Sequence, residues 1–401
     1  MADSCMLHCQ RHVPPILQIP CEVTSEIFKH CLPDDEFPRP SVKSGPVQLS
    51  HVCSTWLMLA IRTPHLWSKI LLCTSTQYSE DTKESFTADM ESHVEALEVW
   101  MRRAKSLLLS VHIRYPTLPP DLSSAKIDKV PFMIAIVKYA TRWKDVRLDL
   151  PGESLAFARL LTQHSTSKLE TFHIKDTSGP AFGFGRYCPV GLKSDTAETL
   201  STLSAHASIK YRSHDPAPFV RLRTVSLKHT FPEICLHLLK YCPVLEDLNL
   251  SFHELHSRTN PPEYQTILVP QLRNFHLSHT PNGENGERST VARQAGEIGI
   301  ILDRLQLPRL QSFSLWMTVK GSARYHDPNL PWDYLSRLIS RSNCSLNRLE
   351  LQSPHLDTPS MLECLRLSPE LNHLGIPADD ELERNAARLL PSLDSLHIFK
   401  C

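Results

Sequence analysis

One six-residue pattern recurs along the C-terminal part of the chain: apolar, two polar, apolar, one polar, apolar. The nine copies are Trp143–Leu148, Leu169–Ile174, Leu222–Leu227, Leu245–Leu250, Leu272–Leu277, Leu310–Leu315, Leu346–Leu351, Leu371–Ile376 and Leu393–Ile398. Successive copies begin 22 to 38 residues apart, except for one step of 53 residues that fits two periods. A recurring period of this length is typical of a repeat protein.

Polar and apolar residues alternate within each copy, as they do in a strand that is buried on one face. The fourth and sixth positions are aliphatic or Phe in all nine copies, whereas the third and fifth are polar except for Gly375. The pattern therefore predicts nine short strands, each with one buried and one exposed face.

Segments with helical spacing of apolar residues lie between these predicted strands. Two such segments carry the apolar residues Ile234, Leu238 and Leu239, and Leu335, Leu338 and Ile339. A proline precedes several copies closely, where it ends a helix and favours extended backbone. These prolines are Pro243, Pro270, Pro308, Pro369 and Pro391.

Strand, connection, helix and connection form a repeating β–α unit, in which consecutive strands are parallel and the helices lie on one side. One unit cannot bury its own apolar face, so neighbouring units must stack. The array resembles an irregular leucine-rich-repeat solenoid, which implies a curved parallel sheet with an inner row of polar residues. A doubly wound α/β domain is the alternative fold on periodicity alone.

Two segments interrupt the repeat. Residues 174–222 include GPAFGFGRYCPVGLKS, which indicates a degraded repeat or a long loop. Residues 280–288, TPNGENGER, are polar and precede a segment that predicts a long amphipathic helix. The apolar residues of that helix are Ile298, Ile301, Leu302 and Leu305.

Residues 16–72 lack the six-residue pattern. Apolar spacing there predicts short helices over Glu22–Leu32 and Val47–Ile61, separated by a polar loop from Asp34 to Pro46. A further apolar segment containing Leu66, Trp67, Ile70 and Leu71 closes this region. If this segment is counted as a third short helix, the three helices bury little core, so a partner or the adjoining repeats must cover them.

This N-terminal region resembles the F-box family. The matching motifs are Ile19-Pro20-Cys21-Glu22, Val52-Cys53-Ser54-Thr55-Trp56 and Leu66-Trp67, with Ile19 in place of the usual Leu. The resemblance implies a substrate receptor of an SCF-type (Skp–cullin–F-box) ubiquitin ligase, whose F-box binds the Skp adaptor and through it a cullin. The adaptor-binding residues that we expect are Ile19, Pro20, Val23, Ile27, Phe28, Leu32, Leu49, Val52, Cys53, Trp56 and Trp67.

The polar positions of the predicted strands form a surface that solenoids use to bind other proteins. An unidentified target protein is therefore the second expected partner. The residues that we expect to contact it are His173, Asp247, Asn249, Asn274, His276, Arg348 and Glu350.

Charge and composition narrow the function further. Lys plus Arg and Asp plus Glu both number 43, without a long run of one sign, which argues against a nucleic-acid or membrane-surface partner. No apolar run is long enough to span a bilayer, and the N-terminus lacks a signal-peptide pattern, so we expect a cytoplasmic or nuclear protein. The 12 cysteines are scattered, and Cys53, Cys235 and Cys364 in apolar patterns predict buried thiols without a disulfide framework.

Candidate chemical sites are weak. Cys5, His8, Cys9 and His12 are zinc-ligand types, but they fall within eight residues, too close together for a zinc finger. Three glycines, Gly179, Gly183 and Gly185, lack the Lys-Ser/Thr of a phosphate loop. No nucleophile elbow or His-Glu metal helix occurs, so we expect no enzyme activity, cofactor or metal.

The sequence therefore predicts an α+β protein: a tail at 1–15, an all-helical F-box at 16–72, a linker and bridging helix at 73–104 and a leucine-rich-repeat-like α/β solenoid at 105–401. The bridging helix contains Val94, Leu97, Trp100 and Met101. The alternative function is a cofactor-binding or enzymatic α/β domain that carries an F-box as a degradation tag.

Overall fold

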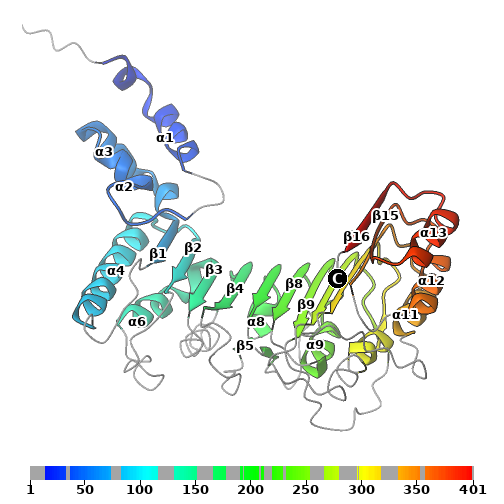
Figure 1. Cartoon of the computed structure of the whole chain (residues 1–401). Helices are drawn as coiled ribbons and strands as arrows, with labels where there is room; N and C mark the ends of the chain where they lie inside the picture. The colour runs from blue at the N-terminus through cyan, green and yellow to red at the C-terminus, as the bar shows by residue number, and fades with distance from the viewer. Residues whose placement is uncertain are drawn as a thin grey trace, which may run out of the picture.

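The chain combines a large sheet with helices on one of its faces (Figure 1). A computed structural model describes residues 14–32, 37–73, 83–115, 131–150, 166–177, 190–192, 194–206, 209–211, 219–228, 232–252, 266–279, 296, 298–317, 333–352 and 357–399.

Twelve parallel strands form the main sheet, and they follow one another across it in chain order. They are β1 Lys69–Cys73, β2 Leu109–Arg114, β3 Trp143–Leu150, β4 Thr171–Asp176, β6 Thr202–Ala205, β8 Thr224–Lys228, β9 Asp247–Phe252, β11 Asn274–His279, β13 Ser312–Met317, β14 Arg348–Gln352, β15 His373–Pro377 and β16 Ser395–Phe399. Two additional parallel pairs are β5 Val190–Leu192 with β7 Ile209–Tyr211, and β10 Ile267–Leu268 with β12 Leu305–Gln306.

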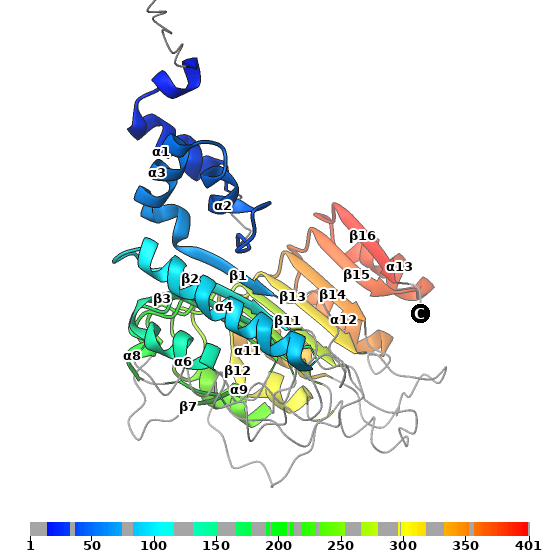
Figure 2. The same cartoon turned by 90° about the vertical axis from the view of Figure 1, so that its left-hand side faces the viewer.

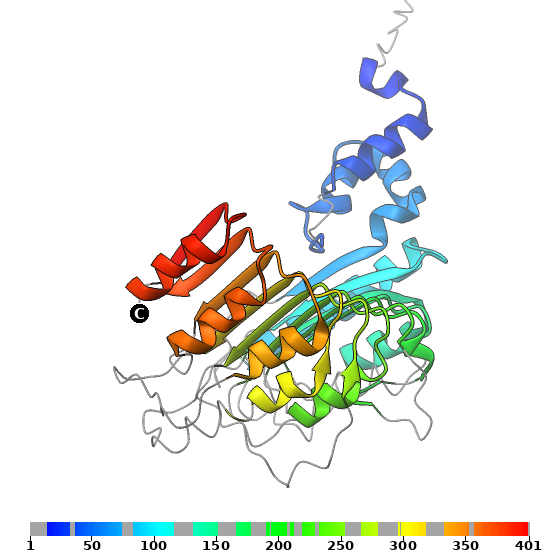
Figure 3. The ribbon, with the colours of Figure 1, turned by 90° about the vertical axis from the view of Figure 1, so that its right-hand side faces the viewer.

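Helices that connect the strands lie along the outer face, and the sheet curves so that the other face, which carries none of the described helices, is concave (Figures 1 and 3). They are α4 Lys83–Arg103, α6 Pro131–Lys138, η4 Ala140–Arg142, α8 Ser194–Ala197, α9 Pro232–Leu239, α11 Tyr334–Ser342, α12 Thr358–Arg366 and α13 Asp380–Leu389. Residues 298–303 are also helical. This parallel sheet with helices confirms the expected combination of α and β structure.

All nine copies of the six-residue pattern end in strands of this sheet, as the alternation predicts. Strand pairing aligns equivalent positions, so that Phe275 on β11 lies between Leu248 on β9 and Phe313 on β13. The fourth and sixth positions form two rows of core residues beneath the helices, and most of them are less than 3% exposed. The exceptions are Leu396 and Ile398 on β16, the last strand.

Three further strands lack a full copy of the pattern. On β6, the segment Leu200–Ala205 has the right spacing but ends in Ala, and it fills the 53-residue gap with one degraded repeat. On β1 and β2, Leu71 and Leu109 are leucines at positions where the pattern requires a polar residue. The sheet thus begins at β1, inside the range 16–72.

The prolines and connecting helices largely follow the expectations. Each of the five prolines that precede a copy of the pattern lies in a turn two residues before its first leucine. Helices α9 and α11 occupy the two predicted segments, and α4 contains the predicted bridging residues. The expected long helix through Leu305 is wrong at its end, because Leu305 begins β12 and pairs with Ile267.

The N-terminal helices stand beyond the β1 end of the sheet (Figures 1 and 2). They are η1 Pro15–Gln18, α1 Cys21–His30, α2 Gly45–Ser50, α3 Ser54–Arg62 and η2 Pro64–Trp67. The helix expected over Val47–Ile61 is interrupted, because Cys53 has extended backbone and caps α3. The expected closing segment contains η2 and then β1.

Trp67 packs between these helices and the sheet region. Its side chain is fully buried, its indole Nε1 donates a hydrogen bond to the carbonyl of Ala60 at 2.8 Å, and its ring packs edge-on against Trp100 of α4. The guanidinium of Arg103 lies 4.2 Å from the centre of the same ring. The tryptophan thus joins α3 to α4.

The loop before α2 provides a second attachment. The carbonyl of Pro38 accepts a hydrogen bond from the amide of Leu71 at 2.9 Å, which covers part of the β1 edge. Phe37 is 8% exposed and packs on His112 of β2, with the guanidinium of Arg147 of β3 4.9 Å from its ring centre. This loop therefore packs onto the concave face of the sheet.

Several predicted features lie outside the described residues. They are Cys5, His8, Cys9, His12, Gly179, Gly183, Gly185 and the segment 280–288. None of the helices among the described residues combines the length and apolar character needed to cross a bilayer.

Candidate protein-binding surfaces

Apolar side chains remain exposed on the N-terminal helices although the chain has an extensive buried core. Val23 and Ile27 on α1, Val52 before α3, and Leu57, Met58 and Ile61 on α3 are 37–60% exposed. We call these six residues the helical docking surface. Large apolar side chains that a fold leaves exposed on neighbouring short helices are candidate contact sites for other proteins.

Eleven residues were expected to contact an adaptor, and their exposure divides them into two groups. Pro20, Val23, Ile27 and Val52 are exposed, and Ile19 and Cys53 are half-buried. The remaining expected residues pack partly or wholly inside the chain: Phe28, Leu32, Leu49, Trp56 and Trp67.

Phe28 and Trp67 are corrections to the expected contact surface. Both are fully buried, and the Phe28 ring packs edge-on against Trp56 with 4.8 Å between the ring centres. A side chain that is already covered by its own fold cannot also contact a partner. These two residues stabilise the helices that carry the docking surface.

Leu57, Met58 and Ile61 were missed by the sequence reasoning. They lie on α3, where most residues are apolar, so the spacing alone does not say which side packs inward. The buried Ala60 and half-buried Trp56 lie on the inward side of α3. Because that side of the helix is turned inward, Leu57, Met58 and Ile61 on its other side remain exposed.

The concave, helix-free face of the sheet is the second surface, and we call it the open face. It carries the third and fifth positions of each repeat and also the seventh, one residue beyond the pattern. The expected target-binding residues all belong to it: His173, Asp247, Asn249, Asn274, His276, Arg348 and Glu350. All except Glu350 are half-buried or exposed.

Glu350 is a correction, because its carboxylate is already used inside the chain. It accepts hydrogen bonds from Arg348, from Ser314 at 3.2 Å and from His373 at 3.1 Å, and its side chain is 12% exposed. Burial alone would raise the pKa of Glu350, but Arg348 first and then His373 and Ser314 lower it overall. The residue organises its neighbours on β13, β14 and β15.

Asp149 at the end of β3 is the centre of a second polar cluster. Its carboxylate lies 3.0 Å from His112 Nε2, 3.3 Å from Arg114 Nε and 3.6 Å from His173 Nε2. Burial would raise the pKa of Asp149, but the hydrogen bonds and charges of the two histidines outweigh it and hold that pKa well below its usual range. Asp149 thus joins β2, β3 and β4 across the open face.

Aromatic residues gather on the open face near the C-terminal strands. The Trp316 ring centre lies 6.1 Å from that of His276 and 5.7 Å from that of Phe399, which is 4.7 Å from His397. Trp316 is 39% exposed. Gly375 leaves room for Phe399, because a Cβ atom at this position would lie 2.9 Å from its ring.

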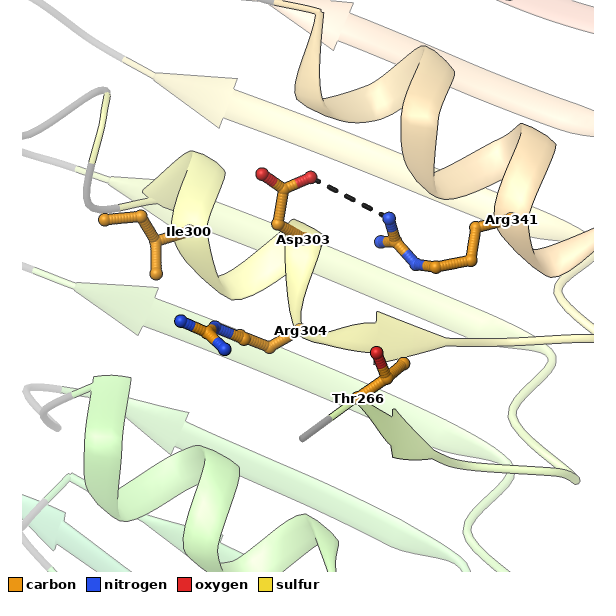
Figure 4. A pocket seen from close by; sticks show the side chains of 5 residues that line it. All are labelled: Thr266, Ile300, Asp303, Arg304 and Arg341. Atoms are coloured by element: carbon orange, nitrogen blue, oxygen red, sulfur yellow. Dashed lines mark ion pairs between the residues drawn. The ribbon is translucent and has the colours of Figure 1, made fainter. Parts of the chain in front are cut away.

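A polar pocket of about 340 Å³ lies on the helical side of the sheet (Figure 4). It is lined by Thr266, Ile300, Asp303, Arg304 and Arg341. Arg341 donates hydrogen bonds to the carbonyls of Leu302 at 2.7 Å and Leu305 at 3.1 Å, and it lies 3.8 Å from Asp303. Its guanidinium therefore connects α11 to the preceding unit.

The described residues contain no cluster of three or more His, Cys, Asp or Glu side chains placed to hold a metal ion. Cys235 and Cys364 are buried as expected, whereas Cys53 is half-buried. Burial raises the pKa of the Cys364 thiol to about 12, which keeps it protonated.

No protein-family model matches the chain, and no curated protein is similar enough to it to count as a match.

Proposed function

We propose that the chain is a substrate receptor of an SCF-type ubiquitin ligase. In this proposal, residues 16–72 form an F-box that binds a Skp-type adaptor, and their last residues enter the sheet as β1. The following β–α units form a leucine-rich-repeat-like solenoid that binds a target protein. The other ligase subunits transfer ubiquitin, so the chain itself catalyses no step.

The observation that carries the proposal is the helical docking surface. Six large apolar side chains on or beside the short N-terminal helices are exposed, while Phe28 and Trp67 in the same region are fully buried. Apolar anchors of this kind dominate the free energy of protein interfaces. The short helices therefore have both a fixed internal core and a surface that a helical partner would cover.

The open face supports the second half of the proposal. Twelve strands present their outward residues on one concave surface, which no helix among the described residues covers (Figure 1). Repeat proteins bind partners on extended concave surfaces of this type. The N-terminal helices stand beyond one end of the sheet, so adaptor and target would occupy different parts of the molecule (Figure 2).

Affinity purification tests the proposal directly. The full chain, expressed with a tag in eukaryotic cells, is expected to co-purify a Skp-type adaptor and a cullin, identified by mass spectrometry. Val23→Glu combined with Ile27→Glu places two charges on the helical docking surface, where burying them against a partner is costly. We expect the double variant to lose both ligase subunits.

A matched control distinguishes an effect on the helical docking surface from an effect of the added charges alone. Val220→Glu combined with Leu268→Glu makes the same chemical change at two exposed apolar residues of the repeat region. This variant is expected to retain the adaptor. Equal recovery of the adaptor with both variants, or its absence from the wild-type sample, would refute the assignment.

A further inference from the structure

On three neighbouring strands, the side chains that point to the open face are all hydroxyl or basic. We call their nine outward residues the basic sector: Thr171, His173 and Lys175 on β4, Thr202, Ser204 and His206 at β6, and Thr224, Ser226 and Lys228 on β8. His206 follows β6 directly, and its ring centre lies 6.5 Å from that of His173. The sector contains no carboxylate.

The hydroxyl groups and the two lysine ammonium groups of the basic sector are available to a ligand. Its five hydroxyl side chains are half-buried, and none of them makes a hydrogen bond with other described residues. Lys175 and Lys228 likewise form no ion pair within the described part of the chain. Ammonium groups beside hydroxyl donors are the chemistry that binds anionic side chains.

The nearest carboxylates border the basic sector and are engaged by neighbouring side chains, Asp149 in part by His173 of the sector itself. Asp149 is engaged by His112, Arg114 and His173, and Asp145 pairs with Arg147 at 3.0 Å. On the other side, the Asp247 carboxylate accepts a hydrogen bond from the side-chain amide of Asn274. Carboxylates thus border the basic sector on both sides, which limits the ligand's anionic part to a short stretch.

A second feature of the same face lies four strands away from the centre of the basic sector. From β6 the order continues through β8, β9 and β11 to β13, which carries the exposed Trp316 beside Phe399. Parallel strands are spaced about 4.8 Å apart, so Trp316 lies roughly 19 Å from β6 across the sheet. An extended peptide covers that distance in about six residues, at roughly 3.4 Å per residue.

We propose that the open face binds an extended protein segment with two parts: neighbouring anionic side chains in the basic sector, and an aromatic or leucine side chain at Trp316 and Phe399 about six residues away. The assignment of this segment to the ligase target rests on the proposed function. A nucleic acid fits less well, because Asp145 and Asp247 would face its continuing phosphates.

Selection from a random peptide library tests the proposal. A phage-displayed library of 16-residue peptides is panned on the purified full chain. The enriched peptides are expected to contain at least two neighbouring acidic residues and an aromatic residue or leucine five to seven positions away. Enrichment of peptides without acidic residues would overturn the proposal, and so would failure to enrich any peptide.

Two variants connect the selected peptides to the basic sector. Lys175→Glu combined with Lys228→Glu is expected to weaken the best peptide at least tenfold in fluorescence anisotropy. Lys168→Glu combined with Arg388→Glu makes the same change of net charge at exposed residues outside the sector, and it should change the affinity less than twofold. Equal affinity for both double variants, or tighter binding of a 12-nucleotide single-stranded RNA than of the best peptide, would contradict the proposal.

Synthetic peptides then distinguish the two sources of negative charge. Replacing the acidic residues by phosphoserine identifies phosphorylated segments if the affinity rises, and Asp/Glu-rich segments if it does not. Adaptor binding is measured on the same Lys175→Glu/Lys228→Glu protein and should be unchanged. A chain that binds the peptides but no adaptor would refute the ligase assignment and leave the peptide site intact.

Discussion

Two adjacent residues of α1 differ completely in exposure: Ile27 is 43% exposed and Phe28 is fully buried. Both are apolar, and the resemblance to the F-box family implied that both contact an adaptor. Helical geometry separates them by about 100° around the axis, and the contact between Phe28 and Trp56 determines which one faces inward. The sequence therefore indicated the region that carries exposed apolar residues, but which of its residues face outward depends on the packing.

This difference in burial predicts a large effect of one alanine substitution and a small effect of the other. Phe28→Ala removes a buried ring and should reduce the local stability of α1 by about 3 to 5 kcal/mol, whereas Ile27→Ala should change it by about 0.5 kcal/mol or less. Hydrogen exchange of the amides in Cys21–His30 measures both effects. Equal exchange rates in the two variants would show that Phe28 does not form the core of these helices.

Asp149 gives a pH-dependent prediction at the same scale. Its folded-state pKa lies below the unfolded value of about 3.9, so the ionised carboxylate stabilises the fold above that pH, and the contribution is lost as the pH falls further. Asp149→Asn should therefore cost about 2 kcal/mol of unfolding free energy at pH 7. The difference from wild type should shrink as the pH falls below about 4.

Denaturant unfolding of wild type and Asp149→Asn across this pH range provides the measurement. A difference that stays constant down to pH 3 would show that the ionised carboxylate does not contribute through its histidine and arginine partners. Asp145→Asn is a useful comparison, because Asp145 contacts Arg147 on its own strand and does not join separate strands.

At the scale of the element, nine strands could be predicted because both of their core positions are large and apolar. The repeat at β6 was obscured by Ala205, and those at β1 and β2 by Leu71 and Leu109, yet all three strands pair with their neighbours, with one register shift between Leu109 and Ser110 on β2. Pairing with an adjacent strand thus tolerates residues that break the local alternation. The seventh position, which carries Lys175, Lys228 and Trp316, lies beyond the repeated pattern and was missed for that reason.

Arg341 is one of the side chains that connect helix α11 to the preceding unit. Arg341→Met keeps most of the apolar stem but leaves the carbonyls of Leu302 and Leu305 without these hydrogen bonds. We expect a loss of about 1 to 3 kcal/mol in unfolding free energy. Arg337→Met, which removes an exposed ion pair with Asp303, should cost about 1 kcal/mol or less and serves as the control.

At the scale of the whole molecule, the N-terminal helices are attached to the sheet through side chains distant in sequence. Trp67 packs on Trp100, and Phe37 packs on His112 of the open face. The sequence identified both tryptophans as apolar residues of separate segments, but their contact depends on the path of β1 between them. The position of the helices beyond the sheet is therefore a property of tertiary packing.

Cysteine labelling reports on this arrangement in the intact protein. Cys21 and Cys31 at the two ends of α1 are exposed, whereas burial raises the pKa of Cys242 and of Cys364 to about 12. Native labelling with N-ethylmaleimide at pH 8 should therefore modify the first pair at least a hundredfold faster, because the thiolate is the reactive form. Peptide mass spectrometry measures each rate, and comparable rates for all four would contradict the described burial.

The most direct test of the ligase assignment is a calorimetric titration of the full chain with a purified Skp-type adaptor. We predict one-to-one binding by the wild type, at least a hundredfold weaker binding by Val23→Glu/Ile27→Glu, and unchanged binding by Val220→Glu/Leu268→Glu. Absence of binding by the wild-type chain, or equal affinity for the two folded variants, would contradict the ligase assignment.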